Sequence, residues 1–325
     1  MRRSANLLTI GDVGKWVWEM KPSYSPRMRP VALLLMMGAL LVATGCARKE
    51  ATSVADAAPT VPGEKRFPLK GEIVAVNKDR GTLTVTHEAI KDYMPGMTME
   101  FKAAAGDLAI AKPGEHIRAE LVVRGQDFSL EKIWPDDTAT AAALAASANA
   151  LAQDTVMRGK GAYREIGETL PDFTLLDQEG RTVSGSRFRG KQVVLNFIFT
   201  RCPVANMCPA ATLRMMALQK AARTAGVTDL ELVSISLDPE YDTPGVLKDY
   251  AAARGIDTSN FSFLTGPDAA VRQMLAQLGI LREFDGPTIK HTLATVLVNE
   301  QGKISYRVDG SAWTPDEFIG HMRKG

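Results

Sequence analysis

The chain has 325 residues, of which 45% are hydrophobic and 23% charged, and its formal net charge is +2. This length exceeds the usual size of one domain, so we expect two folded units and connecting segments. The near-neutral charge argues against nucleic acid as the main partner, because a protein with that role usually carries a strong positive excess.

The first apolar run predicts an export signal. It covers residues 31–42, and it follows two basic residues, Arg27 and Arg29. A run of this length is too short to span a bilayer comfortably, but it suits the core of a signal peptide. We therefore expect a signal peptide over residues 1–45, with Met28 as a credible true start.

Cys46 directly follows three small residues, Ala43, Thr44 and Gly45. The stretch resembles a bacterial lipoprotein cleavage box, although that box prefers Leu where Ala43 stands. The resemblance implies that Cys46 becomes a lipidated first residue on the periplasmic side of a bacterial membrane. The alternative is an ordinary signal peptide with an incidental cysteine. Residues 46–66, rich in Ala, Thr, Pro and Lys, predict a flexible tether.

Residues 67–135 predict a small all-β barrel. Apolar and polar residues alternate over four stretches, and Gly81 and Gly125 separate some of them. The stretches are 71–76, 82–87, 97–101 and 116–123. Residues 136–160 begin with an alanine-rich segment that lacks large apolar anchors, so we expect a linker there, in part helical, rather than a packed element.

The β-rich region carries a methionine-rich motif. Met97 and Met99 share one face of their strand, and His87 ends the apolar face of another. Methionines in such a pattern commonly fill a core. Thioether and imidazole groups together also form a soft ligand set that suits Cu(I) or Ag(I) and needs no thiol.

Residues 69–133 resemble the CusF-like copper-binding domains, a resemblance carried by His87 and by the Met97-Thr98-Met99 element. It implies an OB-like barrel in which His87, Met97 and Met99 bind copper. Better-known members have a Trp where Met94 stands. Met94 is therefore either a further ligand or a spacer.

From residue 161 the pattern changes to strands that alternate with helices, which predicts an α/β layered domain over residues 161–325. Thr314 and Glu317 have the spacing of a capping box for a terminal helix. The expected strands are 193–199, 230–236, 292–298 and 303–308, and the expected helices are 209–225, one from about 243, 267–278 and the terminal one.

Two cysteines, Cys202 and Cys208, lie between a buried strand and a helix. With Cys46 acylated they are the only remaining thiols, so they form a disulfide, a metal-binding dithiol, or a pair that alternates between the two. A helix N-terminus lowers the pKa of a nearby thiol. With His291 the pair would suit copper. The alternative is a structural disulfide with an unrelated histidine.

The whole α/β region resembles the Sco/SenC family of thioredoxin-fold copper proteins. That resemblance implies that Cys202, Cys208 and His291 are copper ligands. It also matches Asp238 to an acidic residue near the site, whereas a turn-forming role before Pro239 is the alternative. The motifs that carry it, in order, are Pro171-Asp172-Phe173-Thr174-Leu175, Gly190-Lys191, Phe199-Thr200-Arg201-Cys202-Pro203, Cys208-Pro209, Ser236-Leu237-Asp238-Pro239-Glu240-Tyr241-Asp242-Thr243-Pro244, Leu264-Thr265-Gly266 and Lys290-His291-Thr292.

The chain departs from the family between its cysteines, where five residues stand instead of the usual three. One of the five is Met207, which is either a further soft ligand or a packing residue. Two extra residues still allow both sulfurs to reach one metal or each other, but they alter the loop.

These features predict a membrane-tethered metallochaperone that carries Cu(I) or Cu(II). The resemblance names the CuA centre of cytochrome c oxidase as the recipient. A flexible linker would raise the effective concentration for transfer between the two domains. One alternative is an enzyme, a thiol–disulfide oxidoreductase in which Cys202 attacks and Cys208 resolves the mixed disulfide. Another is buffering of copper or silver for resistance.

Overall fold

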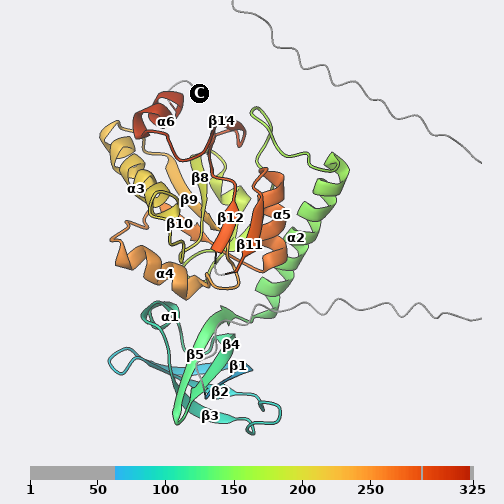
Figure 1. Cartoon of the computed structure of the whole chain (residues 1–325), viewed down its shortest axis with the longest axis vertical. Helices are drawn as coiled ribbons and strands as arrows, with labels where there is room; N and C mark the ends of the chain where they lie inside the picture. The colour runs from blue at the N-terminus through green and yellow to red at the C-terminus, as the bar shows by residue number, and fades with distance from the viewer. Residues whose placement is uncertain (1–62, 287, 323–325) are drawn as a thin grey trace, which may run out of the picture. The chain divides into compact units, whose positions relative to one another are not determined.

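The computed structural model describes residues 63–286 and 288–322 (Figure 1). The predicted signal peptide, Cys46 and nearly all of the predicted tether lie outside the described residues. Within those two ranges, no helix is both long and apolar enough to cross a membrane.

Five strands and one short helix make up the first folded part, which we call the β domain. The strands pair in the order β1-β2-β3-β5-β4, and β4 also pairs with β1, so they form a closed ring. The elements are β1 (Glu64–Asn77), β2 (Thr82–His87), β3 (Met97–Lys102), α1 (Ala105–Ile110), β4 (His116–Arg124) and β5 (Asp127–Pro135).

Alternation along β2 and β3 places one face of each strand in the core of the β domain. Leu83, Val85 and Phe101 are fully buried, and Val85 lies opposite Met99 in the β2–β3 pairing. Gly71 permits a close crossing of β1 over β2, because a Cβ there would lie 2.6 Å from the carbonyl oxygen of Thr86. The ring of strands agrees with the expected all-β region, whereas its OB-like class stays a prediction.

Helix α2 (Thr138–Arg158) occupies most of the segment that was expected to be an unpacked linker. Its side chains Leu144, Ala148 and Leu151 are buried, and it packs against α5 and β6. The expectation of a flexible linker over residues 136–160 is therefore wrong for this stretch. An apolar stripe of two leucines and a few alanines is too thin to stand out as amphipathic in the sequence.

The second folded part, the α/β domain, has a five-stranded sheet in the order β10-β9-β8-β13-β14. Strands β8, β9 and β10 are parallel, and β13 is antiparallel to β8 and to β14. The elements are β6 (Thr174–Leu176), β7 (Thr182–Ser184), the short 3-10 helix η1 (Gly185–Phe188), β8 (Gln192–Ile198), α3 (Cys208–Thr224), β9 (Leu230–Ser236), α4 (Pro244–Ala253), β10 (Phe261–Leu264), α5 (Asp268–Gln277), β11 (Arg282–Asp285), β12 (Thr288–His291), β13 (Ala294–Val298), β14 (Ile304–Asp309) and α6 (Pro315–Met322).

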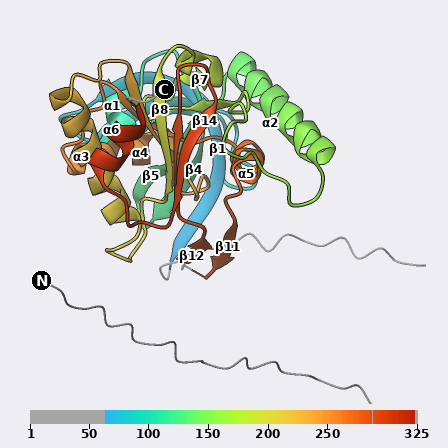
Figure 2. The same ribbon diagram turned by 90° about the horizontal axis from the view of Figure 1, so that it is seen from above.

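Helices cover both faces of this sheet. Figures 1 and 2 show α3, α4 and α6 on one face and α5, with α2 beside it, on the other. The two covered faces explain why β8 reads as a continuous apolar run, since side chains on both of its faces are buried. The capping box is confirmed: the Glu317 backbone N–H donates to Thr314 Oγ1 at 3.4 Å, and Thr314 N–H donates to Glu317 at 3.3 Å.

The sheet topology brings three functional segments to one edge. Strands β8 and β9 run parallel, so the loops that follow Ile198 and Ser236 leave from the same edge of the sheet. The first loop holds Cys202 and ends at α3, and the second leads into α4. The β11–β12 hairpin contributes His291 at its last position.

Candidate metal centres

The two cysteines and His291 lie together at this edge of the sheet. Cys208 is the first residue of α3, and its Sγ lies 3.8 Å from Nε2 of His291. Cys202 lies in the loop before α3, close enough for its thiol to interact with that of Cys208, and both thiols are free. The structure thus brings together the three residues that the sequence predicts as one ligand set.

The imidazole of His291 is held with Nε2 toward the cysteine. Its Nδ1 lies 3.0 Å from the carbonyl oxygen of Thr292. A carbonyl oxygen only accepts, so Nδ1 carries the proton and Nε2 keeps a free lone pair. The ring also packs edge-on against Phe199, at a centroid distance of 5.9 Å. Burial lowers the pKa of His291, which favours the neutral ring that a metal requires.

Cys208 and Cys202 differ strongly in exposure. Cys208 is 1% exposed, and burial raises the pKa of its thiol to about 12. The expectation that the helix N-terminus lowers this pKa is therefore wrong for Cys208. Excluding water destabilises the thiolate by more free energy than the helix dipole stabilises it. Cys202 is only half-buried, so solvent reaches one of the two sulfurs.

The five-residue spacing places the intervening loop in solvent. Cys202 Sγ lies 3.9 Å from the Val204 carbonyl oxygen, and residues 203–206 are exposed. Met207 is half-buried immediately before α3, a position that fits either role left open for it. Among the described residues, no three His, Cys, Asp or Glu side chains already form a metal cluster. Cys202, Cys208 and His291 therefore lie near one another without yet having the spacing of three ligands around one ion.

Asp238 is buried in the turn after β9, and its carboxylate accepts a 2.6 Å hydrogen bond from Nε of Arg201. The guanidinium of Arg201 also lies over the Tyr241 ring, 4.9 Å from its centroid. These contacts support the structural role for Asp238, because its charge is already paired with the residue before Cys202.

Asp242 was not singled out from the sequence, although the motif that carries the resemblance contains it. It is fully buried and accepts hydrogen bonds from the hydroxyls of Ser236 and Thr200 and from the Thr200 backbone N–H. Burial raises its pKa to about 7, and the hydroxyl donors oppose that rise. The sequence gives one indirect signal for this role: the loop before Cys202 needs a hydrogen-bond partner to hold it in place.

The second candidate centre lies at the end of β2 and the beginning of β3. His87 pairs directly with Met97, and Met99 lies two residues along the same face. Nδ1 of His87 lies 2.7 Å from the Glu88 carbonyl oxygen, so Nδ1 is the proton donor. The other nitrogen, Nε2, is buried and has no hydrogen-bond partner among the described residues. A buried nitrogen with a free lone pair is an expected feature of a metal ligand.

The methionines of this motif divide between core and surface. Met94 and Met99 pack against the core of the β domain, whereas Met97 is 47% exposed. Core filling therefore accounts for part of the motif but not for Met97. An exposed thioether opposite an unpaired imidazole nitrogen fits a ligand better than a packing residue.

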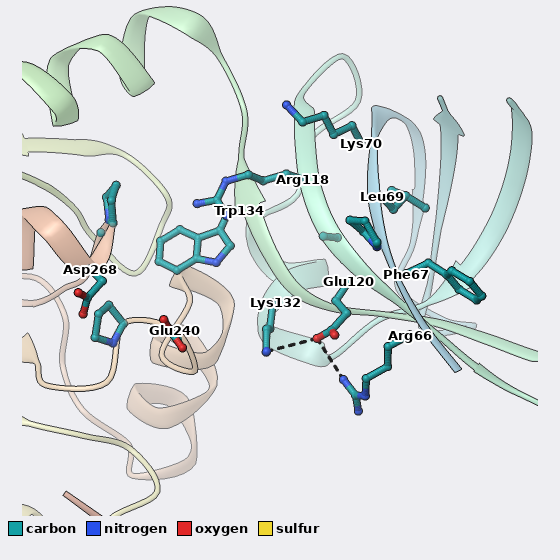
Figure 3. A pocket seen from close by; sticks show the side chains of 15 residues that line it. Arg66, Phe67, Leu69, Lys70, Arg118, Glu120, Lys132, Trp134, Glu240 and Asp268 are labelled. Atoms are coloured by element: carbon teal, nitrogen blue, oxygen red, sulfur yellow. Dashed lines mark hydrogen bonds and ion pairs between the residues drawn. The ribbon is translucent and has the colours of Figure 1, made fainter. Parts of the chain in front are cut away.

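Figure 3 shows the lining of a cavity, and none of these residues belongs to either candidate ligand set; the volume of the cavity is about 550 Å³. Three of its charged side chains pair within the lining, since Glu120 binds both Arg66 and Lys132. Its lining contains no thiol, thioether or imidazole group, so it offers none of the soft ligands found at the two centres.

The donor sets of both centres fit copper. One offers two thiols and an imidazole nitrogen, and the other offers thioethers and an imidazole nitrogen. Such soft sulfur and nitrogen donors suit copper, and the carboxylate-free sets are poor for magnesium or calcium. In each histidine a backbone carbonyl fixes the ring, as is usual for metal-binding imidazoles.

Comparison with known proteins agrees with this division into two parts. Residues 162–324 match the family described as SCO1/SenC, and residues 66–135 match the one described as copper binding periplasmic protein CusF. A SCO1 protein homolog from Bacillus subtilis (strain 168) is 31% identical over 156 residues, which are 46% of this chain and 79% of that protein.

Solved structures were also found. A SCO1/SenC family lipoprotein from Bacillus anthracis str. Ames is 28% identical, with a TM-score of 0.46, covering 50% of this chain and 98% of that one. Bradyrhizobium japonicum ScoI with copper bound is 25% identical, with a TM-score of 0.41, covering 48% of this chain and 99% of that one.

The fold and the site define a thioredoxin-like domain with a dithiol–histidine centre at the edge of its sheet. The chain belongs to the SCO1/SenC family and carries a CusF-like domain ahead of the family domain.

Proposed function

We propose that this protein is a copper metallochaperone that binds copper at both centres and delivers it to another copper protein. The observation that carries the proposal is the position of His291, whose free Nε2 lies 3.8 Å from the Cys208 sulfur. A dithiol that only exchanges disulfides does not require this imidazole. A metal site uses it directly.

In the α/β domain, Cys202, Cys208 and His291 would hold copper and Asp238 would stay paired with Arg201. Copper would be supplied and removed by ligand exchange, in which incoming donors replace the protein's own ligands one at a time. The half-buried Cys202 sulfur is the ligand that an incoming group can reach. In the β domain, His87, Met97 and Met99 would form a thiol-free site suited to Cu(I) in an oxidising compartment.

We further propose that the recipient is the CuA centre of a cytochrome c oxidase subunit. Support comes from BsSco, a relative of solved structure that is described as a member of the Sco family of cytochrome c oxidase assembly proteins. We also propose that the protein is exported and lipid-anchored through Cys46. A family relative from Bacillus anthracis is described as a lipoprotein, and the CusF description is of a periplasmic protein.

The oxidoreductase alternative is less well supported by the structure. Resolution of a mixed disulfide by Cys208 needs its thiolate, and burial raises the pKa of that thiol to about 12. Very little thiolate would exist at neutral pH, so resolution would be slow. Copper binding avoids this limit, because the metal itself displaces the thiol proton.

A Cu(I) titration of the reduced protein tests the ligand assignment. We expect His291→Ala to weaken copper binding by the α/β domain at least tenfold, whereas His321→Ala should leave it unchanged. His321 is a matched control, because it lies in α6 of the same domain and stacks on Tyr306 of β14. Equal affinities for the His291→Ala and wild-type proteins would remove His291 from the site.

Delivery is tested in cells that lack the protein. Wild-type protein should restore oxidase activity at low copper, and Cys202→Ser should not. If Cys202→Ser restores full activity, both delivery and thiol exchange are ruled out and metal buffering becomes the better account.

A further inference from the structure

A buried carboxyl group lies beneath the loop that carries Cys202. Asp242 has no exposed surface, and its two oxygens face three donors: the Thr200 backbone N–H at 3.2 Å, the Thr200 hydroxyl at 2.5 Å and the Ser236 hydroxyl at 2.6 Å. Neither Thr200 nor Ser236 is a candidate ligand. Thr200, however, is separated from Cys202 by a single residue.

A neighbouring backbone group fixes the direction of the hydrogen bond from Ser236 to Asp242. The Asp238 backbone N–H donates to Ser236 Oγ at 2.9 Å, so the Ser236 hydroxyl proton is free to donate to Asp242. The Asp242 backbone N–H in turn donates to the Asp238 carbonyl oxygen at 2.8 Å. Asp242 therefore joins the end of β9 to the start of the cysteine loop.

A second attachment holds the next residue of the same loop. The Arg201 side chain is bound by the Asp238 carboxylate, and the Cys202 backbone N–H donates to the Phe199 carbonyl oxygen at 3.3 Å. Residues 199–202 are thus held from the β9–α4 connection at two consecutive positions. Beyond Cys202 the loop is exposed until Met207, so the position of the Cys202 sulfur depends chiefly on the anchored side.

We propose that Asp242 is a positioning residue that sets where Cys202 lies relative to Cys208. Loss of its carboxyl group leaves the Thr200 N–H and two hydroxyls without their acceptor, and the loop is then free to shift. A shift of one sulfur changes both the stability of the Cys202–Cys208 disulfide and the fit of the two sulfurs to a metal. The copper part of this inference rests on the proposed function, whereas the disulfide part does not.

The experiment compares two buried aspartates of the α/β domain in the otherwise intact protein. Asp177 is the matched control, since it is also buried and accepts from the backbone N–H groups of Glu179 and Arg181, but it anchors the β6–β7 turn. The variants are Asp242→Ala, Asp242→Asn and Asp177→Ala. The readouts are the melting temperature, the dithiol–disulfide equilibrium with glutathione in copper-free protein, and the Cu(I) affinity.

We expect both alanine variants to lower the melting temperature. Only Asp242→Ala should shift the dithiol–disulfide equilibrium, by about tenfold, which corresponds to about 30 mV for this two-electron couple. Cu(I) affinity should fall by a similar factor. Asp242→Asn keeps one acceptor oxygen and should shift both quantities less. Equal shifts in Asp177→Ala, or no shift in a folded Asp242→Ala, would overturn the proposal.

Thr200→Val keeps the test decisive if Asp242→Ala does not fold. It removes only the hydroxyl donor and should shift the equilibrium in the same direction by a smaller factor, and an unchanged equilibrium would overturn the proposal. Failure of the proposed function is distinguishable, because wild-type protein that binds no copper would leave the disulfide comparison fully valid.

Discussion

At the scale of single residues, candidate ligands are easier to identify from the sequence than their protonation states are to predict. His87 and His291 were both identified as candidate ligands, and each proves to have Nδ1 bound by a backbone carbonyl and Nε2 left free of hydrogen bonds to backbone. The pKa of Cys208 could not be predicted in the same way. Its value depends on how completely the folded chain excludes water from the thiol, and that burial cannot be read from the sequence.

The pKa of Cys208 predicts that copper binding depends on pH. The thiol is protonated below about pH 12, so binding a thiolate there releases a proton and affinity rises as pH rises. His291 releases none near neutral pH, because its pKa is lowered and its ring is already neutral. We expect Cu(I) affinity of the His87→Ala protein to rise about tenfold per pH unit for each proton released, between pH 6 and 8.

The control for this prediction is the Cys202→Ser, Cys208→Ser double variant, whose remaining site contains thioethers and no thiol. A flat affinity for His87→Ala over the same range would mean that Cys208 does not ligate the metal. The measurement is a competition titration against a Cu(I) chelator at each pH.

At the scale of elements, long periodic segments were predicted well and thin or short ones were not. Strand β2 has the bounds expected from its alternation, and α3 begins within one residue of the expected start. The short β6–β7 pair and the β11–β12 hairpin were missed because few residues define their pattern. Strand β5 has nine residues but was also missed, because its buried residues Leu130, Ile133 and Trp134 do not keep a period of two. Helix α2 was misjudged for another reason, since its burial depends mainly on α5, which lies far away in sequence.

Helix α2 should behave as part of the α/β domain in solution. Leu151 is 4% exposed, so Leu151→Ala should lower the free energy of unfolding of this domain by about 2–4 kcal/mol. Val156, in the same helix, is 81% exposed, and Val156→Ala should change it by less than about 0.5 kcal/mol. Chemical denaturation measures both, and equal effects would mean that α2 does not pack as described.

At the scale of the whole molecule, two chemically different copper sites are predicted on one chain. The resemblance of each part to a known family could be seen from ordered motifs, and the comparisons confirm both. The five-residue spacing was the feature whose effect the sequence left open. The structure shows that the added length enters an exposed loop, while Cys208 keeps its place at the start of α3.

Reduced protein should therefore bind two copper ions per chain. The double variant His87→Ala, Met97→Ala should bind one copper ion, because it loses the donor set of the β domain. The double variant Cys202→Ser, Cys208→Ser should also bind one, because it loses the donor set of the α/β domain. His116→Ala is the control for the β domain, because His116 is an exposed histidine at the start of β4. Metal analysis after gel filtration gives the count, and two copper ions in the His87→Ala, Met97→Ala protein would exclude the β-domain site.

The unequal burial of the two cysteines has a kinetic consequence. For copper held between them, a donor arriving from solvent meets the Cys202 sulfur first, because Cys208 is buried at the start of α3 whereas Cys202 is only half-buried. Exchange would then follow a set order, in which the outer bond breaks early and the inner bond breaks last. The metal would keep at least one protein ligand until the incoming donor had already bound it. Such an order limits escape of free copper during transfer.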